Sequence, residues 1–91
     1  MLDKEGRIMI PEEFRESYLA KGQVYIYYSE KEKVFFLMPE EVSHLYMVAI
    51  RNLDKKGRFY VPKAVINVYQ SKSVLIASKE RVLHLLPLKE E

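Results

Sequence analysis

The stretch Leu2-Asp3-Lys4-Glu5-Gly6-Arg7 occurs twice in this 91-residue chain, the second time as Leu53-Asp54-Lys55-Lys56-Gly57-Arg58. Each copy continues through three residues, the last of them aliphatic, to a proline, in Ile8-Met9-Ile10-Pro11 and Phe59-Tyr60-Val61-Pro62. Two later segments also match at slightly smaller offsets: Val24-Tyr25-Ile26 with Val74-Leu75-Ile76, and Leu37-Met38-Pro39 with Leu85-Leu86-Pro87. The sequence therefore predicts two copies of one small β-rich unit.

The rarer residue types support this duplication. Both aspartates of the chain, Asp3 and Asp54, open the repeated stretch, and two of the three glycines, Gly6 and Gly57, are equivalent. The four prolines form two equivalent pairs. Repeats of this length often form solenoids, but a solenoid needs about three units to bury its faces. Two units favour a pseudo-dimer around a shared core, in a single domain of residues 1–91 with repeat one at 1–42 and repeat two at 45–91.

Each repeated stretch predicts a tight turn, then a strand, then a helix. Asp3 and Asp54 are expected to accept hydrogen bonds from the backbone of the turn, and Gly6 and Gly57 to supply a positive φ at little steric cost. The turn leads into a short strand, and Pro11 or Pro62 then suits the first position of the helix. These strands are expected at residues 7–10 and 58–61. An apolar face is expected on each helix, formed by Phe14, Tyr18 and Leu19 in the first and by Val65, Val68 and Tyr69 in the second.

Two hairpins and one additional strand are expected after the helices. Four ranges are rich in β-branched and aromatic residues and flank polar turns: Gln23–Tyr28 and Val34–Met38 in repeat one, and Ser73–Ala77 and Val82–Leu86 in repeat two. His44–Asn52 predicts a further strand that leads into the second motif and has no counterpart before the first. The expected fold class is mostly β with short helices.

The composition indicates a folded, soluble and cytoplasmic protein. Hydrophobic residues make up 48% of the chain, and the absence of cysteine excludes disulfides and thiolate metal sites. No apolar run is long enough to cross a bilayer, and the start lacks signal-peptide character. The net charge is +2, but residues 1–45 carry six basic and nine acidic side chains and residues 46–91 carry nine and four. This asymmetry fits one basic face, although a fluctuation of solvated surface charge is the simpler explanation of it taken alone.

Residues 2–15, Leu-Asp-Lys-Glu-Gly-Arg-Ile-Met-Ile-Pro-Glu-Glu-Phe-Arg, resemble the signature of the AbrB/SpoVT, MazE and MraZ superfamily. That signature is Asp-x-x-Gly-Arg, an apolar strand, proline, a helix that begins with an apolar-Arg pair, and a hairpin. The second repeat keeps the motif and its proline but has Ile66 where the first repeat has Arg15. The tandem arrangement is similar to that of MraZ. The resemblance implies a swapped-hairpin (double-split) β-barrel, formed by the two repeats as an intrachain pseudo-dimer.

The resemblance also implies DNA binding through arginines of the motif and the early helix, which are Arg7, Arg58 and Arg15 in this sequence. A guanidinium group offers a planar fork of donors for phosphate oxygens or guanine edges. For Arg7 and Arg58, the alternative is a structural pair with the motif aspartate or the carbonyls of the turn. Five further basic residues suit phosphate contact, with solvated surface as the alternative for each: Lys4, Arg51, Lys55, Lys56 and Lys63. The second unit is expected to contribute more to DNA binding, since Lys56 replaces Glu5.

Other candidate sites are weaker. The run Tyr25, Tyr27 and Tyr28 offers a stacking surface for single-stranded nucleic acid, but packing in the core or at an interface is favoured. His84 lies in an apolar strand, where packing is favoured over metal binding. No His-Asp-Ser constellation and no phosphate-cradling glycine loop is visible. Neither catalysis nor a cofactor, a metal or a small-molecule substrate is therefore expected.

The sequence thus predicts a nucleoid-associated transcriptional regulator whose partner is double-stranded DNA, with self-association into higher oligomers left open. The alternatives are a MazE-like antitoxin or protein-interaction module, and an assembly scaffold whose barrel no longer binds DNA. Antitoxins of that kind usually carry an acidic, disordered tail after the barrel. The sequence given stops at Leu88-Lys89-Glu90-Glu91, directly after the last expected strand, so an antitoxin is the less favoured expectation.

Overall fold

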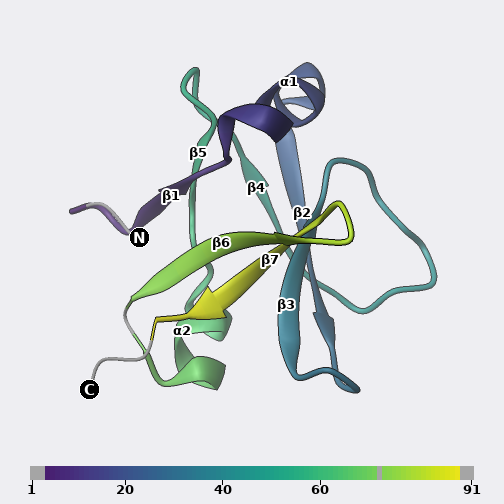
Figure 1. Ribbon diagram of the computed structural model, residues 1–91, viewed down its shortest axis with the longest axis vertical. Coiled ribbons are helices and arrows are strands. Elements are labelled where there is room, and N and C mark those ends of the chain that lie inside the picture. Colours follow the sequence, from purple (N-terminus) through teal and green to yellow (C-terminus); the bar gives the residue numbers. More distant parts are fainter. Residues whose placement is uncertain (1–3, 72, 89–91) are drawn as a thin grey trace.

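The computed structural model describes residues 4–71 and 73–88, and Figure 1 shows how they are arranged. The elements in these residues are β1 (Arg7–Met9), α1 (Glu12–Lys21), β2 (Gln23–Ser29), β3 (Val34–Met38), β4 (Met47–Asn52), β5 (Arg58–Tyr60), α2 (Lys63–Tyr69), β6 (Val74–Lys79) and β7 (Val82–Pro87). The strands form a two-stranded sheet, β1–β5, and a five-stranded sheet in the order β4-β2-β3-β7-β6, and all the pairings are antiparallel. The chain is therefore mostly β with two short helices, as expected.

The two-stranded sheet joins the two repeated stretches to each other. Two backbone hydrogen bonds flank it, from the Ile10 N–H to the Gly57 carbonyl at 2.9 Å and from the Val61 N–H to the Gly6 carbonyl at 3.2 Å. The pairing is symmetric between the repeats, because the middle residues of the two strands, Ile8 and Phe59, are equivalent in the repeat and lie opposite each other. The paired residues are Arg7 with Tyr60, Ile8 with Phe59, and Met9 with Arg58.

The two motifs also have the same backbone shape. Gly6 and Gly57 both adopt a positive φ, of 82° and 80°. Pro11 and Pro62, which precede the two helices, have φ and ψ values of −56° and 145° and of −61° and 146°. The turn–strand–proline–helix order expected from the sequence is therefore present in both halves.

At the centre of the five-stranded sheet, the second strand of the hairpin in repeat one, β3, pairs with the second strand of the hairpin in repeat two, β7. Phe36 of β3 lies opposite His84 of β7, and these two residues are equivalent in the repeat. β2 lies on one side of this central pair of strands and β6 on the other. β4 pairs with the outer edge of β2, with a register irregularity between Ile26 and Tyr27. In residues 4–71 and 73–88, no strand occupies the corresponding edge of β6.

The strand bounds differ from the expectation mainly where turns intervene. The additional strand begins at Met47 rather than at His44, because a hydrogen bond from the Leu45 N–H to the Val42 carbonyl, at 3.3 Å, closes a turn before it. β6 continues to Lys79 rather than ending at Ala77. The hairpin there is closed by only two residues, Glu80 and Arg81, both at positive φ, so the ladder extends up to the turn.

One residue of the expected helix faces is misplaced. Tyr18 and Val65 are buried, but the Val68 side chain is 54% exposed, so the apolar face expected on the second helix packs against the core only in part. α2 is only seven residues long and contacts the core through Val65, Ile66 and Tyr69. That stripe leaves Val68 turned toward solvent.

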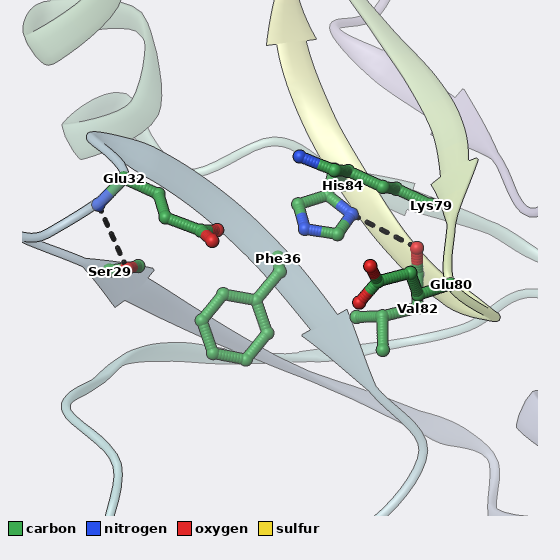
Figure 2. A pocket seen from close by; sticks show the side chains of 7 residues that line it. All are labelled: Ser29, Glu32, Phe36, Lys79, Glu80, Val82 and His84. Atoms are coloured by element: carbon green, nitrogen blue, oxygen red, sulfur yellow. Dashed lines mark hydrogen bonds between the residues drawn. The ribbon is translucent and has the colours of Figure 1, made fainter.

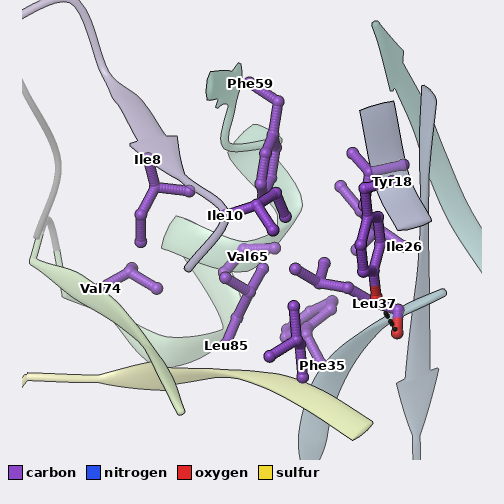
Figure 3. Close-up of a cluster of buried hydrophobic side chains, with 12 residues drawn as sticks. Ile8, Ile10, Tyr18, Ile26, Phe35, Leu37, Phe59, Val65, Val74 and Leu85 are labelled. Carbon is purple, nitrogen blue, oxygen red and sulfur yellow. Dashed lines mark hydrogen bonds between the residues drawn. The ribbon is translucent and has the colours of Figure 1, made fainter. Parts of the chain in front are cut away.

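Buried side chains from both sheets and both helices meet in one cluster, and Figure 3 shows most of them pointing toward a common centre. Ile8 and Phe59 come from the two-stranded sheet, Tyr18 and Val65 from the helices, and Leu37 from the five-stranded sheet. Removal of this apolar surface from water is the main favourable contribution to folding. Within the part of the chain described, no helix is long and apolar enough to cross a membrane.

Two tyrosines at equivalent positions of the repeat anchor the helices to the sheet. The Tyr18 hydroxyl donates to the Leu37 carbonyl at 3.1 Å, and the Tyr69 hydroxyl donates to the Leu85 carbonyl at 2.6 Å. The Tyr69 hydroxyl also accepts a hydrogen bond from the Phe35 N–H at 2.9 Å. Burial raises the pKa of both phenols, so each keeps its proton as a donor.

Two tyrosines of β2, Tyr27 and Tyr28, pack inside the protein, as the sequence favoured, whereas Tyr25 is half-buried and donates its hydroxyl to Oε1 of Gln23 at 3.3 Å. Tyr27 is fully buried, stacks on Phe36 with the ring centroids 5.6 Å apart, and accepts a hydrogen bond from the Val42 N–H at 2.7 Å. Tyr28 packs against Phe35, on the opposite face of the sheet, with the ring centroids 4.7 Å apart. A ring as buried as that of Tyr27 cannot stack on a nucleic-acid base.

We expect Tyr69→Phe to destabilise the protein more than Tyr18→Phe. The first substitution removes two hydrogen bonds and leaves the Phe35 N–H without its partner, which costs roughly 1–3 kcal/mol, whereas the second removes one bond, at roughly 1 kcal/mol. Urea unfolding at constant pH measures both free energies. Equal losses in the two variants would show that the bond to Phe35 contributes nothing.

Candidate nucleic-acid interface

The outward face of the β1–β5 ribbon gathers the arginines expected from the sequence. Ile8 and Phe59 point into the core, so alternation turns their neighbours on both strands outward. The outward side chains are Arg7 and Met9 on β1, and Arg58 and Tyr60 on β5. Met9 and Tyr60 are 43% and 54% exposed, which makes them the apolar part of this face.

Asp54 organises the turn before β5. One carboxylate oxygen, Oδ1, accepts hydrogen bonds from the N–H groups of Lys56 and Arg58, each at 2.9 Å. The other, Oδ2, lies 2.6 Å from Nε of Arg58. The Arg58 N–H bond, then the Arg58 side chain and the Lys56 N–H, hold the pKa of the Asp54 carboxyl below its ordinary value, against a smaller opposing effect of burial. The structural alternative for Arg58, a pair with its own motif aspartate, is thus present.

Arg7 connects the two repeats. Its Nη1 lies 3.7 Å from Oδ2 of Asp54, the same oxygen that Arg58 contacts, and its Nη2 lies 2.8 Å from a carboxylate oxygen of Glu5. The guanidinium carbon lies 6.0 Å from the centre of the Tyr60 ring, at the limit of a cation–π contact. Arg7 and Arg58 therefore converge on one carboxylate. Asp3, the other motif aspartate, lies outside the described residues.

Arg15 reaches from α1 onto the turn of the other repeat, and Figure 1 shows that turn beside α1. Its Nε and Nη2 donate to the Ile10 carbonyl at 3.3 and 3.2 Å, and Nη2 also lies 3.3 Å from the Met9 sulfur. A Cβ atom on Gly57 would lie only 3.1 Å from Cγ of Arg15, so a larger residue here is strained by the φ of 80° and also requires the Arg15 side chain to shift. At Gly6, no atom of residues 4–71 or 73–88, apart from those of Gly6 itself and its two chain neighbours, lies within 4 Å of the equivalent Cβ position.

The remaining predicted residues lie around this face rather than in it. Lys4, Lys55 and Lys56 are exposed on the two motif turns, and Lys63 is exposed in the first turn of α2. Arg51 lies on β4, where its Nη1 donates to the Ile50 carbonyl at 3.0 Å. The structure therefore brings Arg7, Arg15 and Arg58 together and leaves the lysines at the periphery.

Three members of this face were not predicted as site residues. Met9 and Tyr60 alternate with Arg7 and Arg58 along the strands, and that period of two identifies them once the buried face is known. Glu5 was noted only as the acidic counterpart of Lys56, and its ion pair with Arg7 was not expected.

A cleft on the far face of the five-stranded sheet is separate from this interface. It has a volume of about 290 Å³, and Figure 2 shows Glu32 on one side, His84 and Lys79 on the other, and Phe36 between them. The His84 Nδ1 lies 3.0 Å from the Val82 carbonyl, and its ring centre lies 6.2 Å from that of Phe36. In the described ranges, 4–71 and 73–88, no group of three His, Cys, Asp or Glu side chains is placed to hold a metal ion.

We expect Gly57→Ala to destabilise the protein more than Gly6→Ala. Both substitutions place alanine at a positive φ near 80°, at a cost of roughly 1–2 kcal/mol, but only Gly57→Ala also meets the Arg15 side chain. Urea unfolding of the two variants gives the difference. Arg15→Ala in the Gly57→Ala background should recover that difference, and a failure to recover it would reject the contact as its cause.

We expect Asp54→Asn to lower stability in a pH-dependent way. Because folding lowers the pKa of Asp54 from 3.8, the carboxylate contributes its full stability at pH values well above 3.8 and loses it as the pH falls through the folded-state value. The wild type and the variant should therefore differ at neutral pH and converge in acid, as measured by unfolding midpoints from pH 2 to 7. A difference that stayed constant over this range would contradict the assignment.

No family model, curated protein or solved structure matches this chain.

Proposed function

We propose that this chain binds double-stranded DNA through the outward face of the β1–β5 ribbon and acts as a transcriptional regulator of the AbrB/MraZ type. The observation that carries the proposal is the convergence of Arg7, Arg15 and Arg58 on one ribbon built from both repeats. The same proposal includes a swapped-hairpin barrel, with the two repeats as an intrachain pseudo-dimer. The symmetric pairings of β1 with β5 and of β3 with β7 support it.

A two-stranded ribbon with outward arginines is a suitable element for a DNA groove. The major groove of B-DNA admits a two-stranded β-ribbon, and guanidinium groups that project from it can reach guanine edges or phosphates. Arg7 and Arg58 are held by Asp54, and Arg15 by the Ile10 carbonyl, so their side chains are ordered before DNA binds. Ordered side chains lose less conformational entropy on binding.

The electrostatic contribution is expected to be larger from the second repeat. Lys55 and Lys56 are exposed on the turn before β5, where lysine side chains can neutralise phosphates on either side of the groove. On the first turn, Glu5 pairs with Arg7 and offsets its charge. For Arg7 to contact DNA, its ion pair with Glu5 has to break. Otherwise Arg7 acts only by positioning Asp54.

The proposed activity is binding and not catalysis. The carboxylate of Asp54 is occupied by two backbone N–H groups and Arg58, and Glu5 is occupied by Arg7. Carboxylates engaged in this way order a turn, whereas general acid–base catalysis needs a group within reach of a substrate proton.

Arg58→Ala should weaken binding to duplex DNA by roughly tenfold or more, and should reduce the slope of log affinity against log salt by about one. The affinity of the wild type should fall steeply between low and moderate salt, because phosphate contacts release counterions. A random-sequence duplex pool, titrated at two salt concentrations, provides the measurement.

Arg81→Ala is the matched control for this experiment. Arg81 is exposed on the turn between β6 and β7, away from the ribbon, and its substitution removes the same charge. If the two variants bind DNA equally well, the ribbon is not the interface. If the wild type shows no salt-dependent binding at all, the DNA-binding function itself is rejected.

A further inference from the structure

β6 is one of the two edge strands of the five-stranded sheet in the described residues. On the equivalent strand of the other repeat, β2, the outer edge is covered by β4. β6 pairs with β7 along its whole length and, within residues 4–71 and 73–88, has no strand on its other side (Figure 1). The repeat therefore contains one edge that carries a fifth strand and one equivalent edge that is open.

The hairpin geometry identifies which amides face that open edge. In a two-residue hairpin, the residues that flank the turn form a hydrogen-bonded pair, and such pairs alternate along the ladder. Lys79 and Val82 flank the turn here, so Lys79, Ala77 and Leu75 bond to β7. The hydrogen bond from the Leu88 N–H to the Ser73 carbonyl, at 2.9 Å, continues this alternation, because Ser73 lies two residues before Leu75. The N–H groups of Ile76 and Ser78 consequently point away from β7.

The side chains of β6 do not discourage pairing. Soluble proteins usually protect an edge strand with charged residues, proline or a bulge. β6 reads Val-Leu-Ile-Ala-Ser-Lys, in which only the last residue is charged, and its register with β7 is uninterrupted. At the opposite edge of the sheet, β4 contains Arg51 and Asn52 and lies across the register irregularity at Ile26 and Tyr27.

We propose that β6 pairs with β6 of a second copy of this chain, antiparallel and about a two-fold axis, so that two five-stranded sheets become one continuous sheet. A two-fold axis perpendicular to the sheet keeps each side chain on its own face. A residue can therefore lie opposite only those residues of the second copy that are an even number of positions away in the sequence. With Ile76 opposite its own equivalent, Leu75 faces Ala77 and Val74 faces Ser78, and Lys79 does not face its counterpart. Like charges therefore do not oppose each other, and the isologous contact closes at two copies.

The proposal is tested by amide hydrogen exchange at increasing concentrations of the full chain. The amides of Ile76 and Ser78 should become protected as the chain associates, whereas those of Leu75 and Ala77 should be protected even at high dilution. Sedimentation on the same samples should show a monomer–dimer equilibrium. A chain that stays monomeric at millimolar concentration, or a dimer in which Ile76 and Ser78 still exchange freely, would overturn the proposal.

Ser78→Pro should weaken the dimer by about tenfold or more, because it removes one intermolecular donor from each copy without breaking a bond to β7. Ser43→Pro is the matched control, since Ser43 is exposed and follows Val42 in the turn closed by the Leu45 N–H, a position that accepts proline. Equal dimerisation of the two variants would reject the β6 edge as the contact. Duplex DNA is absent throughout, so the result does not depend on the proposed function.

Discussion

The pairing of the two repeated stretches across the β1–β5 ribbon is the constraint on which the rest of the structure depends. Ile8 opposite Phe59 places both side chains in the core, and the backbone bonds at Gly6 and Gly57 fix the register on either side. A shift of one residue would exchange the buried and exposed faces of both strands. The same register therefore buries the apolar residues and turns Arg7 and Arg58 outward.

The two halves share a scaffold but carry different residues at equivalent positions. Arg15 covers Gly57, whereas Ile66 takes the same place in repeat two and joins the core, so that no described residue covers Gly6 in the same way. Lys56 stands where the first turn has Glu5. Because the backbone shape is common to both, these differences change the side-chain packing and the surface charge without changing the fold. Positive charge is thereby concentrated around the second turn.

Local features of the sequence predicted most of the elements, because each depends on residues close together in the chain. A run of β-branched, aromatic and other apolar residues after a polar turn predicted the bounds of β3, and the rare glycines and prolines located the turns and helix starts. Features that depend on contacts between distant parts of the chain were harder to predict from the sequence. The exposure of Val68 depends on how much of α2 meets the core, and the bond from Tyr69 to Leu85 depends on the position of β7. Neither follows from the periodicity of one segment.

For the candidate interface, the sequence identified the arginines but not their partners. Arg58 and Asp54 are four residues apart, so their pair was foreseeable as one of two alternatives. The contact of Arg7 with Asp54 joins residues from different repeats and requires the ribbon register. Met9 and Tyr60 alternate with the buried Ile8 and Phe59, but they could be assigned to the interface only once the register of β1 with β5 was known.

The ion pairs at Asp54 do not conflict with a role in binding an anion. Partly exposed pairs of this kind contribute little free energy, since water and salt screen them. Arg58 contacts Asp54 through Nε, and in the described residues its Nη1 and Nη2 make no other hydrogen bond or ion pair. A guanidinium group has five donors, so one edge can hold the turn while the other faces a phosphate or a guanine. The structural and the functional interpretations of Arg58 thus use different atoms of the same side chain, and the first orients the group for the second.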